Sequence, residues 1–141
     1  MSRDAISFFR ERFGIAATDL ERLLGVALSR GGDFADLYFE YNTSGSVFLE
    51  EQIVKSATRS IRQGVGVRVT SAERTGYAYT DEISPSAIER AARTAAAIAR
   101  STGSADPVRV ESGAPSRDLY PGDAPTTDAT VEDKTALLVR A

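Results

Sequence analysis

The side chains available for chemistry in this sequence are carboxylates, hydroxyls and basic groups, because the chain has no histidine and no cysteine. This absence excludes a Ser-His-Asp triad, a thiolate nucleophile, a disulfide and a histidine-containing zinc site within the 141 residues. A hydroxyl nucleophile would need a lysine or a carboxylate as its base, and the only lysines are Lys55 and Lys134. We therefore expect no catalytic residue and no metal ligand set in this chain.

Three pairs of adjacent acidic residues are candidates for general acid and base chemistry. They are Glu50-Glu51, Asp81-Glu82 and Glu132-Asp133. Neighbouring residues on a strand point to opposite faces, so the two acids of such a pair cannot act on one substrate. We expect these pairs to be solvated or to cap helices.

Two closely spaced glycines, Gly64 and Gly66, suggest a phosphate-binding loop at first sight. The third glycine of a G-x-G-x-x-G pattern would fall at Val69, so the pattern fails. The alternating valines around them place both glycines in a strand, where glycine marks a bulge or the close approach of another backbone. A flat strand face that admits a peptide is the alternative.

A basic stretch runs from Lys55 to Arg74 and is followed by Tyr77 and Tyr79. Basic and aromatic side chains on a sheet bind single-stranded nucleic acid by phosphate contacts and stacking. A solvated strand edge, where Lys and Arg discourage edge-to-edge pairing, is the other interpretation. The formal net charge of −3 argues against nucleic acid as the main partner. The basic residues concerned are Lys55, Arg59, Arg62, Arg68 and Arg74.

Hydrophobic periodicity predicts the elements that must position these groups. A short helix ends at Gly14, a second spans about 19–30 behind a Thr18–Glu21 capping box, and a third spans about 85–101 behind Ser84 and Pro85. Between them, period-two alternation predicts strands near 35–41, 47–49, 53–54, 65–69 and 77–79, with a turn at 42–45.

The order of these elements predicts an α+β fold with two layers. A mainly antiparallel sheet of about four strands, within residues 35–80, carries the helices on one face. The expected core includes Leu24, Leu28, Leu37, Phe39, Val67, Val69, Ile88, Ala92 and Ala95.

The amino-acid composition of the chain changes after Gly103, since four of its five prolines lie beyond that point. We expect an N-terminal α+β domain over 1–103, a Pro/Gly-rich linker or the start of another domain over 104–129, and a helix over 130–141. Val108–Val110 is a candidate short strand. The last helix stops in mid-pattern, which predicts a truncated following domain, with a C-terminal helix packed on this domain as the alternative.

The block from Gly32 to Ala99 resembles the N-terminal domain of the TldD/PmbA family, once labelled modulators of DNA gyrase and now understood as metalloproteases. The resemblance rests on "GGDFADLYFEY", "SVFLEEQIVKSATRSIRQGVGVRV" and "ERTGYAYTDEISPSAIERAARTAAAIA". "QGVGVRV" followed by "TGYAYTD" is similar to the TldD branch rather than the PmbA (TldE) branch.

This resemblance implies a function that belongs to a longer protein than this chain. The zinc of the family is held by an HExxxH helix and a cysteine beyond the N-terminal domain, so no catalytic or metal-binding residue carries over here. TldD-like proteins pair with a TldE/PmbA-like subunit and degrade peptides or unfolded segments. The resemblance therefore implies a non-catalytic domain that shapes the substrate approach and subunit assembly, inactive alone.

An edge strand could take an extended peptide through main-chain hydrogen bonds. On this hypothesis the speculative substrate-binding residues are Gly64, Gly66, Arg68, Tyr77 and Tyr79. A gyrase-associated or nucleic-acid-binding module that uses Lys55–Arg74 is the alternative, and a purely structural dimerisation domain is a third hypothesis.

The start of the chain lacks a basic region followed by a long apolar run, so it does not predict a secretory signal. No stretch approaches the ~20 apolar residues that a membrane span requires. We expect a cytoplasmic protein without a membrane partner.

Overall fold

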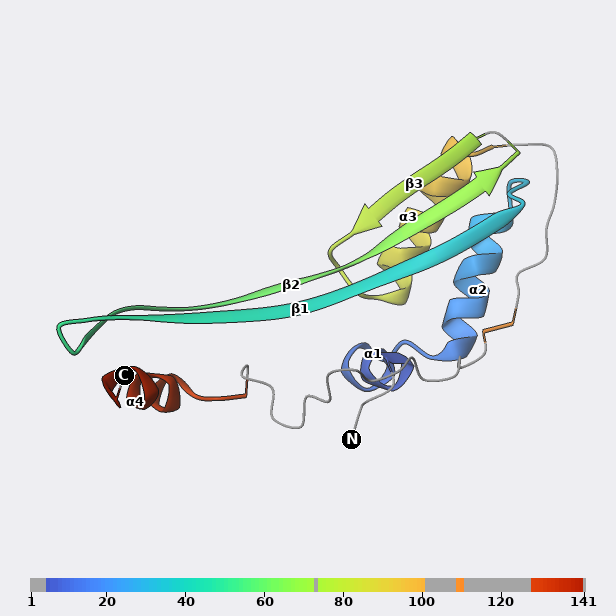
Figure 1. The fold of residues 1–141 in the computed structure, drawn as a ribbon. Helices are drawn as coiled ribbons and strands as arrows, with labels where there is room; N and C mark the ends of the chain where they lie inside the picture. The colour runs from blue at the N-terminus through green and yellow to red at the C-terminus, as the bar shows by residue number, and fades with distance from the viewer. Residues whose placement is uncertain (1–4, 73, 101–108, 111–127, 141) are drawn as a thin grey trace. The chain divides into compact units, whose positions relative to one another are not determined.

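The computed structural model describes residues 5–72, 74–100, 109–110 and 128–140 (Figure 1). The described residues divide into a helix–sheet unit, residues 5–40, 63–72, 74–100 and 109–110, and a hairpin unit, residues 41–62 and 128–140. The elements in chain order are α1 (Ala5–Phe13), α2 (Ala17–Leu28), β1 (Phe34–Glu50), β2 (Ile53–Ser71), β3 (Arg74–Thr80), α3 (Pro85–Ile98) and α4 (Val131–Arg140).

The three strands form one open sheet in the order β1-β2-β3. β2 pairs with β3 antiparallel through seven consecutive residue pairs, from Val65↔Thr80 to Ser71↔Arg74. Hydrogen bonds between side chains join Asp36 to Arg68 and Ser44 to Ser60. The β2 position thus falls as the β1 position rises, which makes this pair antiparallel too. The predicted α+β class is confirmed, with three strands in place of about four.

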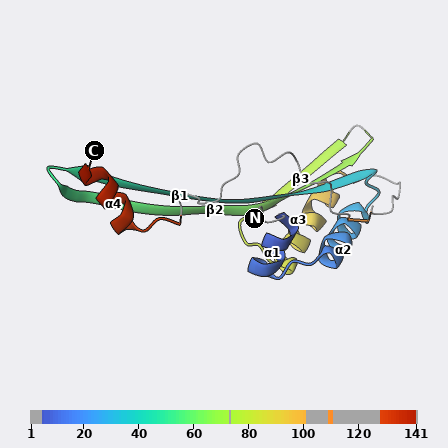
Figure 2. The same cartoon turned by 60° about the horizontal axis from the view of Figure 1, so that its bottom comes forward.

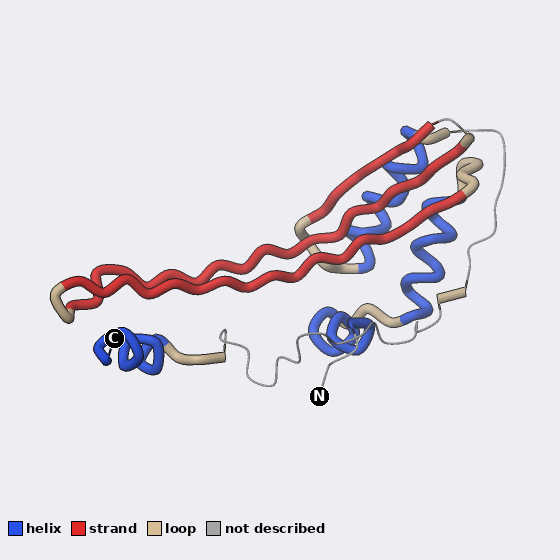
Figure 3. Tube along the Cα trace, in the orientation of Figure 1, coloured by secondary structure: helices blue, strands red, loops and turns tan. Residues whose placement is uncertain are grey.

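The turn predicted at 42–45 is wrong, because β1 runs unbroken through these residues for 17 positions and β2 runs for 19 (Figure 3). Turn-forming residues are held in the strand by their partners. The hydroxyl of Ser44 bonds that of Ser60 at 2.7 Å, and the hydroxyls of Ser46 and Thr58 are also 2.7 Å apart. Such cross-strand pairs stabilise a sheet, and a local turn signal contains no information about them.

The hairpin between β1 and β2 turns at Glu51 and Gln52, which have φ values of 51° and 60°. A two-residue turn with positive φ at both positions is the type I′ geometry, for which Asn-Gly is preferred. A residue with a Cβ pays a steric cost in this left-handed region, and glycine does not.

We expect the double substitution Glu51→Asn and Gln52→Gly to stabilise the hairpin by about 1 kcal/mol, since it supplies the residues that this turn favours. Chemical denaturation would measure the gain. The same two residues placed within β1, by Thr43→Asn and Ser44→Gly, should not stabilise the chain. A loss of stability from the double turn substitution would contradict the assignment of the turn.

The helix signals in the sequence are mostly confirmed. Ser84 caps α3, its hydroxyl accepting the Ala87 N–H at 3.2 Å, and α3 ends at Ile98 rather than near 101. Ahead of α4, the hydroxyl of Thr130 accepts the Asp133 N–H at 3.1 Å, and the Asp133 carboxylate accepts the Thr130 N–H at 3.0 Å. The hydrogen bond from the Thr130 hydroxyl to the carboxylate, at 2.8 Å, and then that from the Thr130 N–H lower the pKa of Asp133.

The start of α2 differs from the prediction. The helix begins at Ala17, so Thr18 lies inside it and does not cap it. The Asp19 carboxylate instead accepts the N–H of Ala16 at 3.0 Å, and the N–H groups of Asp19 and Leu20 bond the Ala16 carbonyl. The predicted Thr18–Glu21 capping box is therefore wrong, and the cap lies two residues earlier, at Ala16 and Asp19. An acid at the third helical position can accept the N–H of an N-cap residue that has no hydroxyl, so the cap carries no Ser or Thr signal.

The core lies between the sheet and the helices of the helix–sheet unit, which cover one face of the sheet (Figure 2). Most of the predicted core is confirmed, but Leu23 is fully buried in place of the half-buried Leu24. Leu37 and Phe39 are partly buried against this core. Further buried residues, outside the list of expected core residues, include Ile15, Leu23, Ala27, Val65, Ile83, Ala91 and Ala99.

β3 lies directly against α3, and Gly76 is the point of closest approach. A Cβ added at Gly76 would lie 2.8 Å from the Ala99 nitrogen and closer still to the Ala95 carbonyl oxygen, so the strand rests on helix backbone. The alanines along this face of α3 permit the short spacing, because they have no side chain beyond Cβ.

An ion-pair cluster joins α2 to α3. The carboxylate of Glu89 is 2.7 Å from both the Arg22 and the Arg93 guanidinium groups. Hydrogen bonds from Arg93 and then from Arg22 lower the pKa of Glu89. A carboxylate with a lowered folded-state pKa stabilises the fold above its unfolded pKa, and this contribution is lost as the pH falls through the folded pKa.

We expect Arg22→Ala to raise the pKa of Glu89 toward its ordinary value, in a titration of the carboxyl carbon by NMR. Arg90→Ala is the matched control, because Arg90 pairs with Glu82 instead, at 3.7 Å. A pKa of Glu89 that is the same in the wild type and in Arg22→Ala would show that the pair does not form.

Among the described residues, no helix has the length and apolar character to cross a membrane. The candidate strand at Val108–Val110 falls partly outside them, and Arg109 and Val110 have no regular structure. Most of the expected linker over 104–129 also lies outside the described residues.

Candidate functional site

The face of the sheet opposite the helices carries most of the residues predicted to bind a substrate. On β2, Val65, Val67 and Val69 are buried against the helices, so Gly64, Gly66 and Arg68 point to the open face. The β2–β3 register places Tyr79 opposite Gly66 and Tyr77 opposite Arg68. The structure therefore brings all five predicted residues together on one face of the helix–sheet unit.

The two tyrosine rings lie diagonally across the glycines. A Cβ at Gly66 would lie 2.5 Å from the Tyr77 hydroxyl oxygen, and one at Gly64 would collide with the ring of Tyr79. The Tyr79 hydroxyl donates to the Gln63 carbonyl at 3.0 Å. The glycines are thus covered by aromatic rings, and the expected close approach of another backbone is wrong. The sides of the two rings that face away from the sheet are exposed to solvent, since Tyr77 is 57% and Tyr79 is 55% exposed.

Arg68 is held by an acid on the neighbouring strand. Its Nε donates to Asp36 Oδ1 at 3.0 Å, and a terminal nitrogen donates to the other carboxylate oxygen. The hydrogen bonds and charge of Asp36 raise the pKa of Arg68. The charge of Asp36 offsets that of Arg68, so the guanidinium is a weaker anchor for a phosphate or a carboxylate than an unpaired one.

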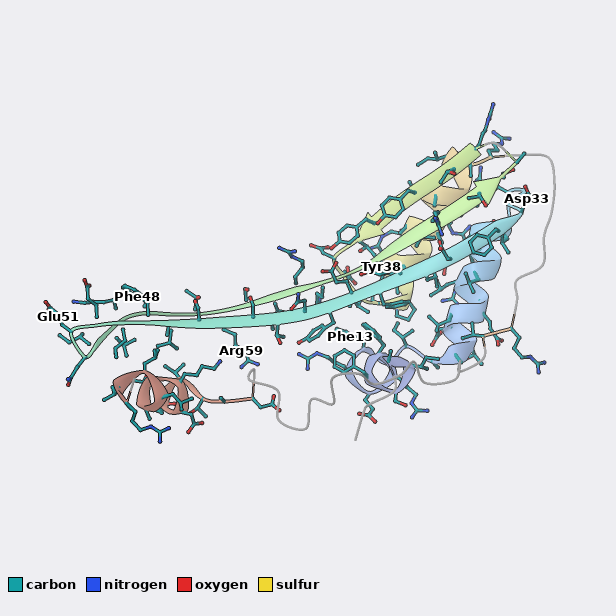
Figure 4. All side chains as sticks on the ribbon, in the orientation of Figure 1. Phe13, Asp33, Tyr38, Phe48, Glu51 and Arg59 are labelled. Atoms are coloured by element: carbon teal, nitrogen blue, oxygen red, sulfur yellow. The ribbon has the colours of Figure 1, made fainter. Side chains whose placement is uncertain are left out.

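Two further aromatic residues on this face were not predicted as site residues. Phe34 is 53% and Tyr38 is 67% exposed, and both share the parity of Asp36 on β1. Tyr38 is labelled in Figure 4. The alternation of Phe34, Asp36 and Tyr38 with the buried-side residues of β1 was the available signal. The open face thus has aromatic residues on both outer strands.

The position of each strand decides which one can pair with an added peptide. β2 has a neighbour on both sides, so the glycine-rich strand cannot accept another strand, and that part of the hypothesis is wrong. Among the described residues, β3 has a strand neighbour only on its β2 side. It has no proline, no bulge in its seven pairs with β2, and no charged residue from Thr75 to Thr80. Natural edge strands commonly carry one of these protective features.

The basic stretch does not form one basic surface within the helix–sheet unit. Arg68 is paired with Asp36 on the open face. Arg74 pairs in register with Ser71, whose side chain is buried on the opposite face from Arg68. The remaining basic residues, Lys55, Arg59 and Arg62, lie in the hairpin unit, where all three are exposed. This arrangement of the basic residues does not support binding along the phosphates of a nucleic acid.

No metal site is formed by the residues that the structure describes, in which no group of three or more acids converges. The helix–sheet unit contains an apolar cavity of about 230 Å³ between α1, α2 and β1. It offers room for an apolar side chain but no polar group for chemistry. Its lining is Ala5, Ile6, Phe9, Ile15, Leu20, Leu37 and Phe39.

In the hairpin unit, none of residues 41–62 is buried, and residues 53–62 of β2 are all exposed. Phe48 and Ile53 are 57% and 58% exposed. A two-stranded ribbon is at best marginally stable in water without a surface to pack on. The start of α4, in the same unit, lies against Gly45 and Thr58. The rest of the hairpin end, defined as Tyr41–Arg62, is therefore a candidate contact surface.

Comparison with known proteins gives one match to a family and several relatives. Residues 35–99 match the family described as PmbA/TldA metallopeptidase domain 1. The chain is 35% identical over 86 residues to the metalloprotease TldD homolog of Haemophilus influenzae, covering 61% of this chain and 18% of that protein. It is 33% identical over 109 residues to the homolog of Buchnera aphidicola from Acyrthosiphon pisum, covering 77% and 22%.

A second Buchnera aphidicola homolog, from Schizaphis graminum, is 41% identical over 66 residues, covering 47% of this chain and 14% of that protein. The chain thus spans between 14% and 22% of the length of these curated relatives. The matched family region contains β2, β3 and α3 complete, together with nearly all of β1.

Proposed function

The chain belongs to the PmbA/TldD metallopeptidase family, and from that premise we propose that it is a non-catalytic first domain that binds extended polypeptide for a TldD-like metalloprotease. The observation that carries the proposal is the outer edge of β3. This edge presents a regular row of main-chain donors and acceptors with no charge, proline or bulge between Thr75 and Thr80.

Strand addition suits an enzyme that acts on peptides or unfolded segments. Main-chain hydrogen bonds supply affinity that does not depend on the sequence of the bound segment. The Tyr77 and Tyr79 rings lie back over Gly66 and Gly64, so space remains above the added strand. Arg68, tied to Asp36, supports the sheet beneath rather than the ligand.

The metal of the protease lies outside this chain in our proposal. The sequence has no histidine or cysteine, and the acids in the described part of the chain do not converge, so its residues do not fit a zinc site. Zinc and the catalytic residues would come from other parts of the family protein. We place that protein in the cytoplasm, with a TldE/PmbA-like subunit as partner.

The hairpin end supports a second role in subunit assembly. Its exposed Phe48 and Ile53 near the turn would contact the TldE/PmbA-like subunit. In the full-length protein, Phe48→Asp should weaken the complex with that subunit, measured by analytical ultracentrifugation, whereas Thr43→Asp, farther from the turn, should not. Equal affinity of both variants would exclude the hairpin turn from the contact.

The peptide-binding proposal is tested by NMR on the 141-residue chain with a soluble peptide of alternating threonine and valine. We expect the amide shifts to change along Thr75–Thr80. Tyr77→Lys, which puts a charge on the β3 edge, should weaken binding about fivefold or more. The matched control is Tyr38→Lys on β1, which has the same substitution on the same face at the other edge. Shifts confined to β1 or the hairpin end would overturn the proposal.

A further inference from the structure

The hairpin unit has a cavity of about 150 Å³ between the two strands of the hairpin end and the start of α4. Residues 43–47 of β1, 57–59 of β2, 129–131 and Lys134 line it. Arg59 and Lys134 bring two positive charges to this lining, and no acid is among the described residues that form it. Such a lining differs from the chain as a whole, whose formal net charge is −3.

The two positive groups meet on one face of the hairpin. Hydroxyl hydrogen bonds join residue 44 to 60 and residue 46 to 58, so Gly45 lies opposite Arg59, on the face away from those hydroxyls. Figure 4 shows Arg59 on the α4 side of the hairpin. Lys134 Nζ lies 3.3 Å from the position of a Cβ at Gly45. Since residues directly opposite each other have Cβ atoms about 5 Å apart, the ammonium is within reach of the long Arg59 side chain.

Gly45 provides the space that the Lys134 ammonium occupies. Glycine inside a strand weakens the strand, and it often marks a place where another group approaches closely. A Cβ at residue 45 would lie 3.3 Å from Lys134 Nζ and 3.5 Å from the Thr58 carbonyl oxygen, so a larger side chain would displace the ammonium. Lys134 is accordingly half-buried, although most of α4 is exposed.

Neither Arg59 nor Lys134 forms a hydrogen bond or an ion pair with the part of the chain that the structure describes. The acid next to Lys134 in the sequence, Asp133, is bonded to Thr130 at the start of the helix. Two like charges held close together without an acid repel each other, and an anion between them would remove that cost. By contrast, the helix–sheet unit pairs these arginines with carboxylates: Arg22, Arg68, Arg90 and Arg93.

We propose that this cavity binds a phosphate group between Arg59 and Lys134. A phosphate monoester carries nearly two negative charges at neutral pH, which match the two cations. A guanidinium can bond two phosphate oxygens at once, and an ammonium adds three donors on a compact charge. Thr43, two residues from Gly45 on the same face, adds a hydroxyl to the lining. The proposal does not rest on peptide binding at β3, because the site lies in the hairpin unit.

The distribution of charge favours a single phosphate group over a nucleic-acid strand. Arg62 is three residues from Arg59 on β2 and therefore points to the opposite face of the hairpin. Lys55 does not line the cavity. A polynucleotide would need several cations along one path. A carboxylate would bring only one charge to the two cations, so it should bind more weakly than phosphate.

The test is an NMR titration of the 141-residue chain with inorganic phosphate, at about pH 7.5 and constant ionic strength. We expect saturable amide shifts at Gly45, Arg59 and Lys134. Lys134→Ala and Arg59→Ala should each weaken binding about fivefold or more, since each removes a charge-assisted hydrogen bond. The matched controls, Lys55→Ala and Arg62→Ala, remove the same charges from exposed positions outside the cavity and should change the affinity less than about twofold.

Two further titrations identify the source of the phosphate and its charge requirement. Tighter binding of N-acetyl-phosphoserine amide than of inorganic phosphate would support the site with a phosphate ester as its ligand, and equal or weaker binding would support it with free phosphate. Acetate should bind at least about fivefold more weakly than phosphate. Acetate that binds as tightly as phosphate, shifts that do not saturate, or equal losses from the cavity variants and the controls would overturn the proposal.

Discussion

Gly76→Ala should destabilise the chain by about 3 kcal/mol, the largest effect we expect from adding a single carbon. The new Cβ would collide with the Ala95 carbonyl oxygen and lie 2.8 Å from the Ala99 nitrogen. Both neighbours are helix backbone, which cannot rotate away as a side chain can. Either β3 lifts off α3 or the helix shifts, and both movements open the core around Val67, Val69 and Ala95.

Chemical denaturation would measure this loss, and the melting temperature should fall by roughly 10 °C or more. Gly66→Ala on β2 is the matched control. The atoms nearest to its Cβ would be the hydroxyl and ring of Tyr77, an exposed side chain that can swing outward. We expect Gly66→Ala to cost less than about 1 kcal/mol. Equal losses from the two variants would mean that β3 does not rest on α3 as described.

Ile88→Ala should destabilise the chain by about 2–5 kcal/mol, because Ile88 is fully buried in the core of the helix–sheet unit. The substitution removes apolar contacts and leaves a cavity that the close-packed alanines of α3 cannot fill. The helix itself should survive, since alanine is the best helix former.

Ile98→Ala provides the comparison on the same helix, with the same atoms removed from a side chain that is 54% exposed. We expect its effect on unfolding to stay within about 0.5 kcal/mol. The difference between the two variants, measured in urea, reports burial alone. A large loss from Ile98→Ala would mean that this side chain is covered in solution, which would contradict its exposure in the structure.

The parts of the fold that local signals determine could be predicted from the sequence. Ser84 followed by Pro85 marks the start of α3, and Thr130 with Asp133 marks the start of α4, because capping involves residues within one turn. The valines at 65, 67 and 69 mark a buried strand face, because their alternation is also a signal contained within a few neighbouring residues.

Features that depend on distant partners could not be predicted in this way. Asn42–Gly45 has the composition of a turn, but the hydroxyls of Ser60 and Thr58 keep β1 extended. The strand order decides that β2 is central, and no residue of β2 encodes that position. Similarly, the sequence brings Gly64 and Gly66 near Tyr79 and Tyr77 only through the β2–β3 register.

The turn at Glu51-Gln52 has a consequence for the order in which the hairpin assembles. A hairpin that closes from its turn needs a turn that forms easily, and two positive φ values at residues with a Cβ make this one a poor nucleus. Zipping should instead start at the β2–β3 pairs that rest on α3 and spread outward along β1 and β2. The same gradient governs opening, so the amide proton of Phe48 should exchange with solvent much faster than that of Val67.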